Sequence, residues 1–161
     1  MTQRTRILIA FIILVAVVGA VLGLDALRRA SSEPTLAPGS IPLYLDGRLV
    51  GRFTPDDLDQ LKKVSFVEAE EGKKQEGWLL RDVILLHVDA SRLEQDSVIT
   101  VSSSSRNRSA TLTWANVDDQ DNMVMFDLSN RGTLKLASLL EKLDTRDEWV
   151  QDADKIEIAS P

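Results

Sequence analysis

The longest apolar stretch lies near the start of the chain. Residues 7–24 (ILIAFIILVAVVGAVLGL) contain no charged or strongly polar side chain. A helix of this length rises about 27 Å, close to the thickness of the hydrocarbon core of a bilayer. The pattern predicts one transmembrane helix, preceded by a cytoplasmic tail over residues 1–6. A secretory signal that is later removed is the alternative, because Val18-Gly19-Ala20 resembles a small-residue cleavage site.

Small residues within the predicted helix suggest a packing surface. Gly19, Ala20 and Gly23 permit close approach of a second helix, and Gly19 and Gly23 have the spacing of a helix-association motif. Small residues that merely face lipid are the other interpretation. Because so short a tail normally stays in the cytoplasm, we expect a single-pass protein of a bacterial inner membrane, with its C-terminal domain in the periplasm.

After the predicted helix the pattern changes to short alternating segments. Residues 25–40 include two prolines, several serines and a glycine, and predict a flexible linker. Residues 41–161 predict an extracytoplasmic domain. A helix is expected to begin at Thr54-Pro55-Asp56-Asp57 and another to cover 78–88, with a charged loop over 70–77. Period-two alternation predicts strands over residues 43–45, 49–53, 64–69, 98–103, 110–114, 123–128, 134–137 and 155–159.

Strands outnumber helices in this domain, and the connections are too short for repeated crossover helices. The predicted fold class is therefore α+β: one N-terminal transmembrane helix followed by a small mixed, strand-rich domain. Apolar residues make up 43% of the chain, which excludes general disorder. The chain has no cysteine and one histidine, which excludes disulfides, zinc ribbons, iron–sulfur ligation, thiolate catalysis and histidine-rich metal sites.

Charge is divided unevenly along the chain. Residues 1–30 carry a net charge of +3, whereas residues 41–161 hold 15 basic and 23 acidic side chains. Nucleic-acid binding needs clustered cations, so an acidic body argues against a nucleic-acid partner. The division suits a soluble domain held beside a lipid bilayer.

Three segments of the domain resemble one known family. Residues 77–84 (GWLLRDVI) are similar to the G-x-P-L-R-D-(V/L)-L helix start of the molybdopterin-binding oxidoreductase domain, the sulfite-oxidase-like fold. Residues 132–136 (GTLKL) stand where that family has a G-x-P-L-R-L strand. Trp149-Val150 and residues 155–158 (KIEI) hold the place of its closing segment. The resemblance spans residues 64–159 and implies a trimmed sulfite-oxidase-like domain.

The departures from the family pattern bear on function. The family's proline is replaced by Leu79 or Leu80, and the arginine of its later motif is Lys135. Enzymes of that family hold molybdenum through a cysteine thiolate, and this chain has no cysteine. The resemblance therefore implies a degenerate relative that has lost the metal centre. No cofactor is expected, and no catalytic, cofactor-binding or metal-binding residue is carried over.

Four features of the domain bear on chemistry. His87, in an apolar run, is either a general base or, as we favour, a partly buried structural residue. Residues 118–122 suggest calcium, but the glycine and glutamate of a calcium loop are missing, so we favour a solvated loop. Trp78, Trp114 and Trp149 are expected in the core. The serine-rich segment followed by Arg106 and Arg108 is either an anion site or, as we favour because no glycine-rich loop or helix start accompanies it, a polar hairpin tip that contacts an acidic partner surface.

These observations predict a non-catalytic accessory or scaffolding subunit of a larger integral membrane protein complex, of a respiratory or photosynthetic electron-transfer type. We expect no nucleic-acid partner and no small-molecule ligand. The alternative is an anchored ligand-binding module that retains a pterin-like or other small-molecule cleft. That alternative requires a polar cleft in which several arginines converge. An active molybdenum oxidoreductase is a third interpretation, which the absence of cysteine opposes.

Overall fold

The structure, a computed structural model, describes residues 39–161. The chain divides into two units, residues 1–36 and 37–161, and all described residues lie in the second. The expected tail over 1–6, the expected membrane helix over 7–24 with Gly19, Ala20 and Gly23, and residues 25–38 of the expected linker lie outside them. Within residues 39–161, no helix is long and apolar enough to cross a bilayer.

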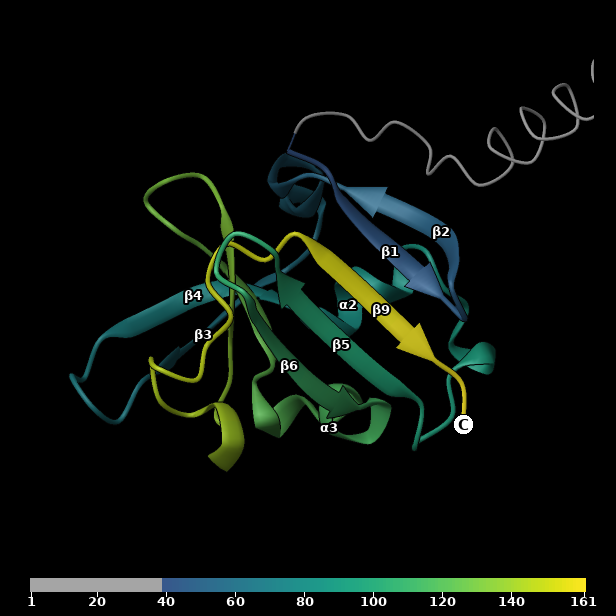
Figure 1. The fold of residues 1–161 in the computed structure, drawn as a ribbon. Coiled ribbons are helices and arrows are strands. Elements are labelled where there is room, and N and C mark those ends of the chain that lie inside the picture. The colour runs from purple at the N-terminus through teal and green to yellow at the C-terminus, as the bar shows by residue number, and fades with distance from the viewer. Residues whose placement is uncertain (1–38) are drawn as a thin grey trace, which may run out of the picture. The chain divides into compact units, whose positions relative to one another are not determined.

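Two sheets carry the fold (Figure 1). The first has the order β2-β1-β9-β5-β6 and the second the order β3-β4-β7-β8. Helices are few and short, so the mixed strand-rich α+β architecture is confirmed. The elements are β1 (Ile41–Leu45), β2 (Arg48–Phe53), η1 (Pro55–Gln60), β3 (Lys63–Val67), β4 (Lys74–Leu79), α2 (Leu80–Leu85), η2 (Ala90–Arg92), β5 (Val98–Ser103), β6 (Arg108–Thr113), α3 (Trp114–Asp118), η3 (Gln120–Asn122), β7 (Met125–Leu128), β8 (Leu134–Ala137), η4 (Glu141–Leu143) and β9 (Lys155–Ala159).

The first predicted hairpin forms where its turn residues require it. Asp46 and Gly47 have φ angles of 51° and 74°, the left-handed values of a two-residue hairpin turn. β1 pairs with β2 in the antiparallel direction and with β9 in the parallel direction. The predicted helix start at Thr54 forms as the 3-10 helix η1, in which the Asp57 carboxylate accepts a hydrogen bond from the Thr54 amide at 2.7 Å.

The prediction for residues 70–88 is partly wrong. Residues 74–79, placed in a charged loop and at a helix start, form strand β4, which pairs with β3 on one side and β7 on the other. Helix α2 is confined to Leu80–Leu85. The inward positions of β4 include Gln75 and Gly77, which carry no hydrophobic signal, while Lys74 and Glu76 point outward. Pairing with two neighbouring strands, rather than apolar alternation, therefore fixes this segment as a strand.

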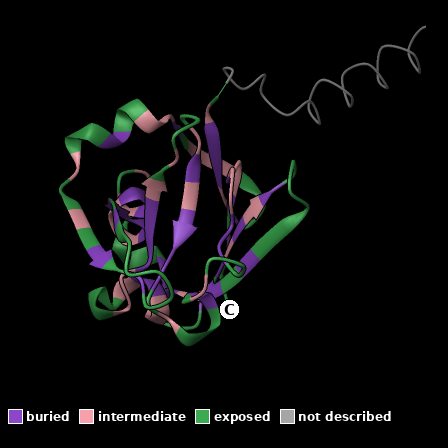
Figure 2. Ribbon diagram, turned by 90° about the vertical axis from the view of Figure 1, so that its left-hand side faces the viewer, coloured by how far each residue is buried: buried purple, intermediate pink, exposed green. Residues whose placement is uncertain are grey.

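The core lies inside the domain, against the inner faces of the sheets. Figure 2 shows buried residues concentrated on the strands and exposed residues on the outer turns. The three tryptophans are buried, as predicted: Trp78 and Trp114 belong to the main apolar cluster, and Trp149 belongs to a smaller one with Phe66, Leu79, Met125 and Ala137. The smaller cluster lies on one face of the second sheet and supports the segment that follows η4.

Candidate functional site

The predicted polar tip between β5 and β6 is present. β5 and β6 pair in register from Val98↔Thr113 to Ser103↔Arg108, and the turn contains Asn107 with a φ of 50°. Asparagine tolerates this left-handed conformation better than most residues because its short side chain bonds locally. Arg106 and Arg108 therefore project from a defined turn at the end of the first sheet.

A second segment, between Trp149 and β9, holds the tip in place. The Ser104 amide donates a hydrogen bond to the Asp154 carboxylate at 2.7 Å, and the Asp154 amide donates to the Ser102 carbonyl at 2.9 Å. Nε of Arg106 donates to Oδ2 of Asp152 at 2.7 Å. These bonds join segments that are far apart in the sequence, so the tip is part of the folded body.

Asp152 is the shared acceptor at this point. Besides Arg106, its carboxylate accepts hydrogen bonds from the Thr133 hydroxyl at 2.7 Å and from Arg131 at 3.2 Å. Its side chain is 17% exposed. The Thr133 hydrogen bond, with help from Arg106, holds the pKa of Asp152 below the ordinary value of 3.8. Asp152 thus stays ionised and fixes the orientation of Arg106.

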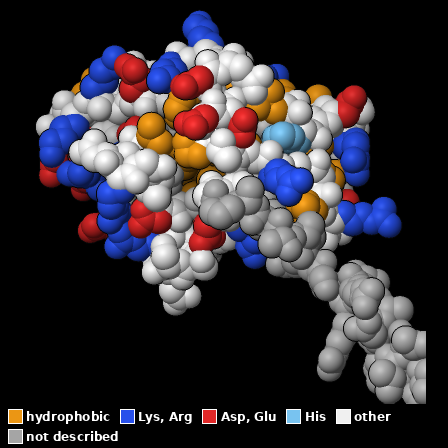
Figure 3. Space-filling model, turned by 90° about the horizontal axis from the view of Figure 1, so that it is seen from above, with side chains coloured by type: hydrophobic (Ala, Val, Ile, Leu, Met, Phe, Trp, Pro, Cys, Tyr) orange, Lys and Arg blue, Asp and Glu red, His pale blue; other side chains and the backbone are white. Residues whose placement is uncertain are grey.

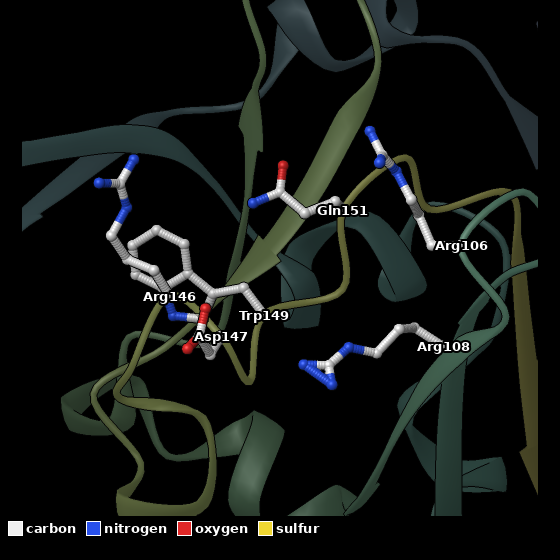
Figure 4. A pocket seen from close by; sticks show the side chains of 6 residues that line it. All are labelled: Arg106, Arg108, Arg146, Asp147, Trp149 and Gln151. Atoms are coloured by element: carbon white, nitrogen blue, oxygen red, sulfur yellow. The ribbon is translucent and has the colours of Figure 1, made fainter.

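Next to the tip lies an open cavity of about 470 Å³. Figure 4 shows Arg108 extending from the right toward Trp149 and Asp147, whereas the guanidinium of Arg146 points up and to the left and that of Arg106 points upward. Its lining consists of Arg106, Arg108, Arg146, Asp147, Trp149 and Gln151. We call it the arginine cavity. It brings together three guanidinium groups and one carboxylate.

Four contacts position the far wall of the arginine cavity. Arg146 forms an ion pair with Glu71 at 2.6 Å, and its amide donates to Glu70 at 3.3 Å. Buried Trp149 donates from its indole Nε1 to the Leu143 carbonyl at 2.9 Å, and the Lys135 ammonium lies 4.7 Å from its ring centroid. The wall is therefore tied to both the β3–β4 hairpin and β8.

The arrangement is suited to holding an oxyanion. Within residues 39–161, the Arg108 side chain forms no hydrogen bond or ion pair, so its donors are directed to solvent or to a ligand. Arg106 and Arg146 each bind one carboxylate, and a guanidinium has five N–H donors, so each of these side chains keeps donors for a further acceptor. A planar guanidinium matches a carboxylate or phosphate through two parallel hydrogen bonds. The arginine cavity thus offers several such donors around one space.

Sequence reasoning identified two of the six lining residues as a candidate contact. It singled out Arg106 and Arg108, which the structure places together in the cavity. It missed Arg146, Asp147 and Gln151, which lie about forty residues farther along the chain, in the segment between η4 and β9. No periodic pattern or motif links the two segments, because their proximity comes from strand pairing between β5 and β9.

The other candidates lie elsewhere. Asp118, in the segment considered for calcium, pairs with Arg81 at 2.7 Å. Among the described residues, no group of three or more His, Asp or Glu side chains is placed to hold a metal ion. His87 follows α2 and stacks on Phe53 with a centroid separation of 6.3 Å; its Nε2 is buried and has no hydrogen-bond partner within residues 39–161. It does not line the arginine cavity.

The environment of His87 predicts a loss of stability in mild acid. Burial lowers the pKa of His87, and the opposing attraction of Asp57 is weaker. The unfolded chain then binds the proton more tightly, so the stabilisation is present above the ordinary pKa of 6.5 and is lost as the pH falls below it. We expect the urea midpoint of the full chain in mild detergent to decrease between about pH 7.5 and about pH 5.5. In His87→Gln this decrease should shrink, and an equal decrease in both proteins would contradict the assignment.

The chain was also compared with known proteins. No protein-family model matches it, and no curated protein matches it.

Proposed function

We propose that the chain is a membrane-anchored, non-catalytic accessory subunit, whose strand-rich domain binds a partner in a larger membrane complex through the arginine cavity. The observation that carries the proposal is that Arg106, Arg108 and Arg146 line one open space. An acidic side chain of a partner subunit is the simplest group for this space. Arginine is also enriched at the centres of protein interfaces.

The remaining parts of the proposal come from the sequence. The apolar segment over residues 7–24 is proposed as the anchor, and Gly19, Ala20 and Gly23 as its packing surface. A periplasmic position, a place in an electron-transfer assembly and a trimmed sulfite-oxidase-like scaffold are proposed with it. In such a scaffold, the lack of cysteine leaves no thiolate for molybdenum.

A second candidate function is a ligand-binding module for an anionic small molecule. The same observation favours it, because three arginines around about 470 Å³ form a polar cleft of the kind such a module requires. The space is open and Asp147 lies in its lining, which suits a contact between protein surfaces better than an enclosed ligand site. We therefore place the accessory-subunit function first.

The test is the native mass of the full chain, extracted from its own membranes in mild detergent, with co-migrating polypeptides identified. We expect the wild-type chain to migrate in a defined complex much larger than its own 17.9 kDa. Arg108→Glu should release it, because the substitution places a carboxylate opposite the partner's acidic group. Migration of the wild-type chain alone would overturn the proposal.

The matched control is Arg48→Glu. Arg48, like Arg108, is the exposed first residue of the second strand in a two-stranded hairpin, and it does not line the arginine cavity. The control should remain in the complex. If both variants leave it, general acidification explains the loss and the arginine cavity is not the contact. Co-purification of a small anion with the chain alone would favour the ligand-binding module.

A further inference from the structure

A second polar cavity adjoins the first. It has a volume of about 690 Å³ and runs from the β3–β4 hairpin, at Lys73 and Lys74, across β7 and β8 to the turn at Arg131. Arg146 and Gln151 line both cavities. The two hollows therefore share a wall and together form one longer polar surface, which we call the basic groove.

Charge in the basic groove is opposite to that of the domain. The two cavities are lined by seven basic side chains and three acidic ones. The whole of residues 41–161 has 15 basic and 23 acidic side chains, so the groove contains nearly half of the cations and few of the anions. In Figure 3, Lys and Arg side chains are numerous on the left of the face seen from above, where Figure 1 places β3 and β4, with Asp and Glu side chains among them. An acidic domain thus concentrates positive charge along one surface.

Six of these seven cations are paired with carboxylates, Arg106 and Arg131 both with Asp152, but the pairs leave donors available. Lys74 contacts Glu76 at 2.7 Å, and both side chains are more than half exposed. Lys73 contacts Glu71, which Arg146 also contacts. Exposed ion pairs of this kind are weak and exchange readily for a competing carboxylate. Lys135 differs from these exposed cations, because its side chain is mostly buried and is bound to both Asp127 and Gln75. It therefore stabilises the wall of the groove.

We infer that the basic groove binds an extended acidic segment of a partner protein, with carboxylates at both ends of the groove. This inference rests on the proposed function and deepens it by naming the chemistry of the partner. A single anion needs only one cavity, whereas two adjoining cavities with cations along both fit a chain that carries repeated carboxylates. Complementary charge of this kind mainly sets specificity and association rate.

The test measures fluorescence anisotropy of a labelled peptide with the full chain in mild detergent. The peptide is about ten residues long, alternates Asp and Glu with Gly and Ser, and is compared with a version carrying Asn and Gln. We expect the acidic peptide to bind and the neutral one not to bind. Binding should weaken as the salt concentration rises from about 50 mM to about 200 mM.

Variants at the two ends of the basic groove distinguish binding along the whole groove from binding at a single site. Arg108→Ala and the double variant Lys73→Ala/Lys74→Ala should each weaken binding about fivefold, and the triple variant about twenty-fivefold, since distant sites act independently. Arg48→Ala is the matched control and should leave binding unchanged. A three-residue acidic peptide should depend on Arg108 and not on the two lysines.

Four results would overturn the inference. The first is that the acidic peptide does not bind the wild-type chain, and the second is that the neutral peptide binds equally well. The third is that the affinity of the ten-residue acidic peptide is unchanged in the Lys73→Ala/Lys74→Ala variant. The fourth is that a single-stranded oligonucleotide binds as tightly as the acidic peptide. The third leaves the proposed function intact, because Arg108 still contacts an anion. Failure of the proposed function is recognised separately, when Arg108→Glu remains in the native membrane complex.

Discussion

Gly77→Ala will cost at least about 3 kcal/mol of unfolding free energy. A Cβ atom at Gly77 would overlap the carbonyl oxygen of Phe126 and lie 2.7 Å from the Phe126 carbonyl carbon. These are backbone atoms of the paired strand β7, so no side-chain rotation relieves the overlap. Relief requires β4 and β7 to separate, which breaks the middle of the second sheet. Urea denaturation of the full chain measures the loss.

The matched control is Gly72→Ala. Gly72 has a φ of 67°, and a Cβ atom added to it would meet no other atom within 4 Å, so the same substitution adds only left-handed backbone strain. That strain costs about 1–2 kcal/mol. If Gly77→Ala were no worse than Gly72→Ala, close packing of β7 on β4 would not be the reason for glycine. β7 also pairs with β8, which carries Lys135. The position of β7 beside β4 therefore helps to place the Lys135 ammonium against the Trp149 ring.

Glu68→Met will stabilise the domain by about 1–3 kcal/mol. Glu68 is 2% exposed, and neither of its carboxylate oxygens has a hydrogen-bond partner within residues 39–161. It follows β3 and lies two residues beyond Phe66, on the same face. Burying a polar group without a partner opposes folding, and methionine fills a similar volume without that cost. Thermal and urea unfolding of the full chain measure the gain.

Glu94→Met is the control for this substitution. Glu94 is exposed, so its replacement should change stability by less than about 0.5 kcal/mol. Glu68→Gln should gain less than Glu68→Met, because an amide in the same place still lacks partners. A loss of stability in Glu68→Met would show that the carboxylate has a favourable contact. A gain would mark Glu68 as a residue kept at the expense of stability, close to the loop that carries Arg146.

Local signals in the sequence were sufficient for much of the fold. The Asp46-Gly47 turn, the alternation of β5 and the closing strand β9 are all encoded by neighbouring residues, and each was predicted at nearly its observed position. Such features depend on turn chemistry and side-chain period, which act within a few residues. The burial of the three tryptophans follows from the same reasoning.

Strand β4 shows where local signals fail. Its buried residues include Gln75 and Gly77, which contact the Lys135 side chain and the Phe126 backbone respectively. Both partners lie on strands much farther along the chain, so the segment resembles a charged loop when taken alone. The arginine cavity has the same character: Arg106 and Arg108 are close in sequence and were found, but only the completed fold brings Arg146 to the lining of the same cavity.

The position of β9 has a consequence for how the domain is assembled during synthesis. β9 is synthesised after the other strands of residues 39–161, yet it lies in the middle of the first sheet, between β1 and β5. Until it emerges, β1 and β5 each expose an unpaired edge, and the hairpins formed earlier have no common partner. High contact order of this kind slows folding and leaves early segments open to wrong pairing. The first sheet therefore cannot be completed until residues 155–159 have been synthesised.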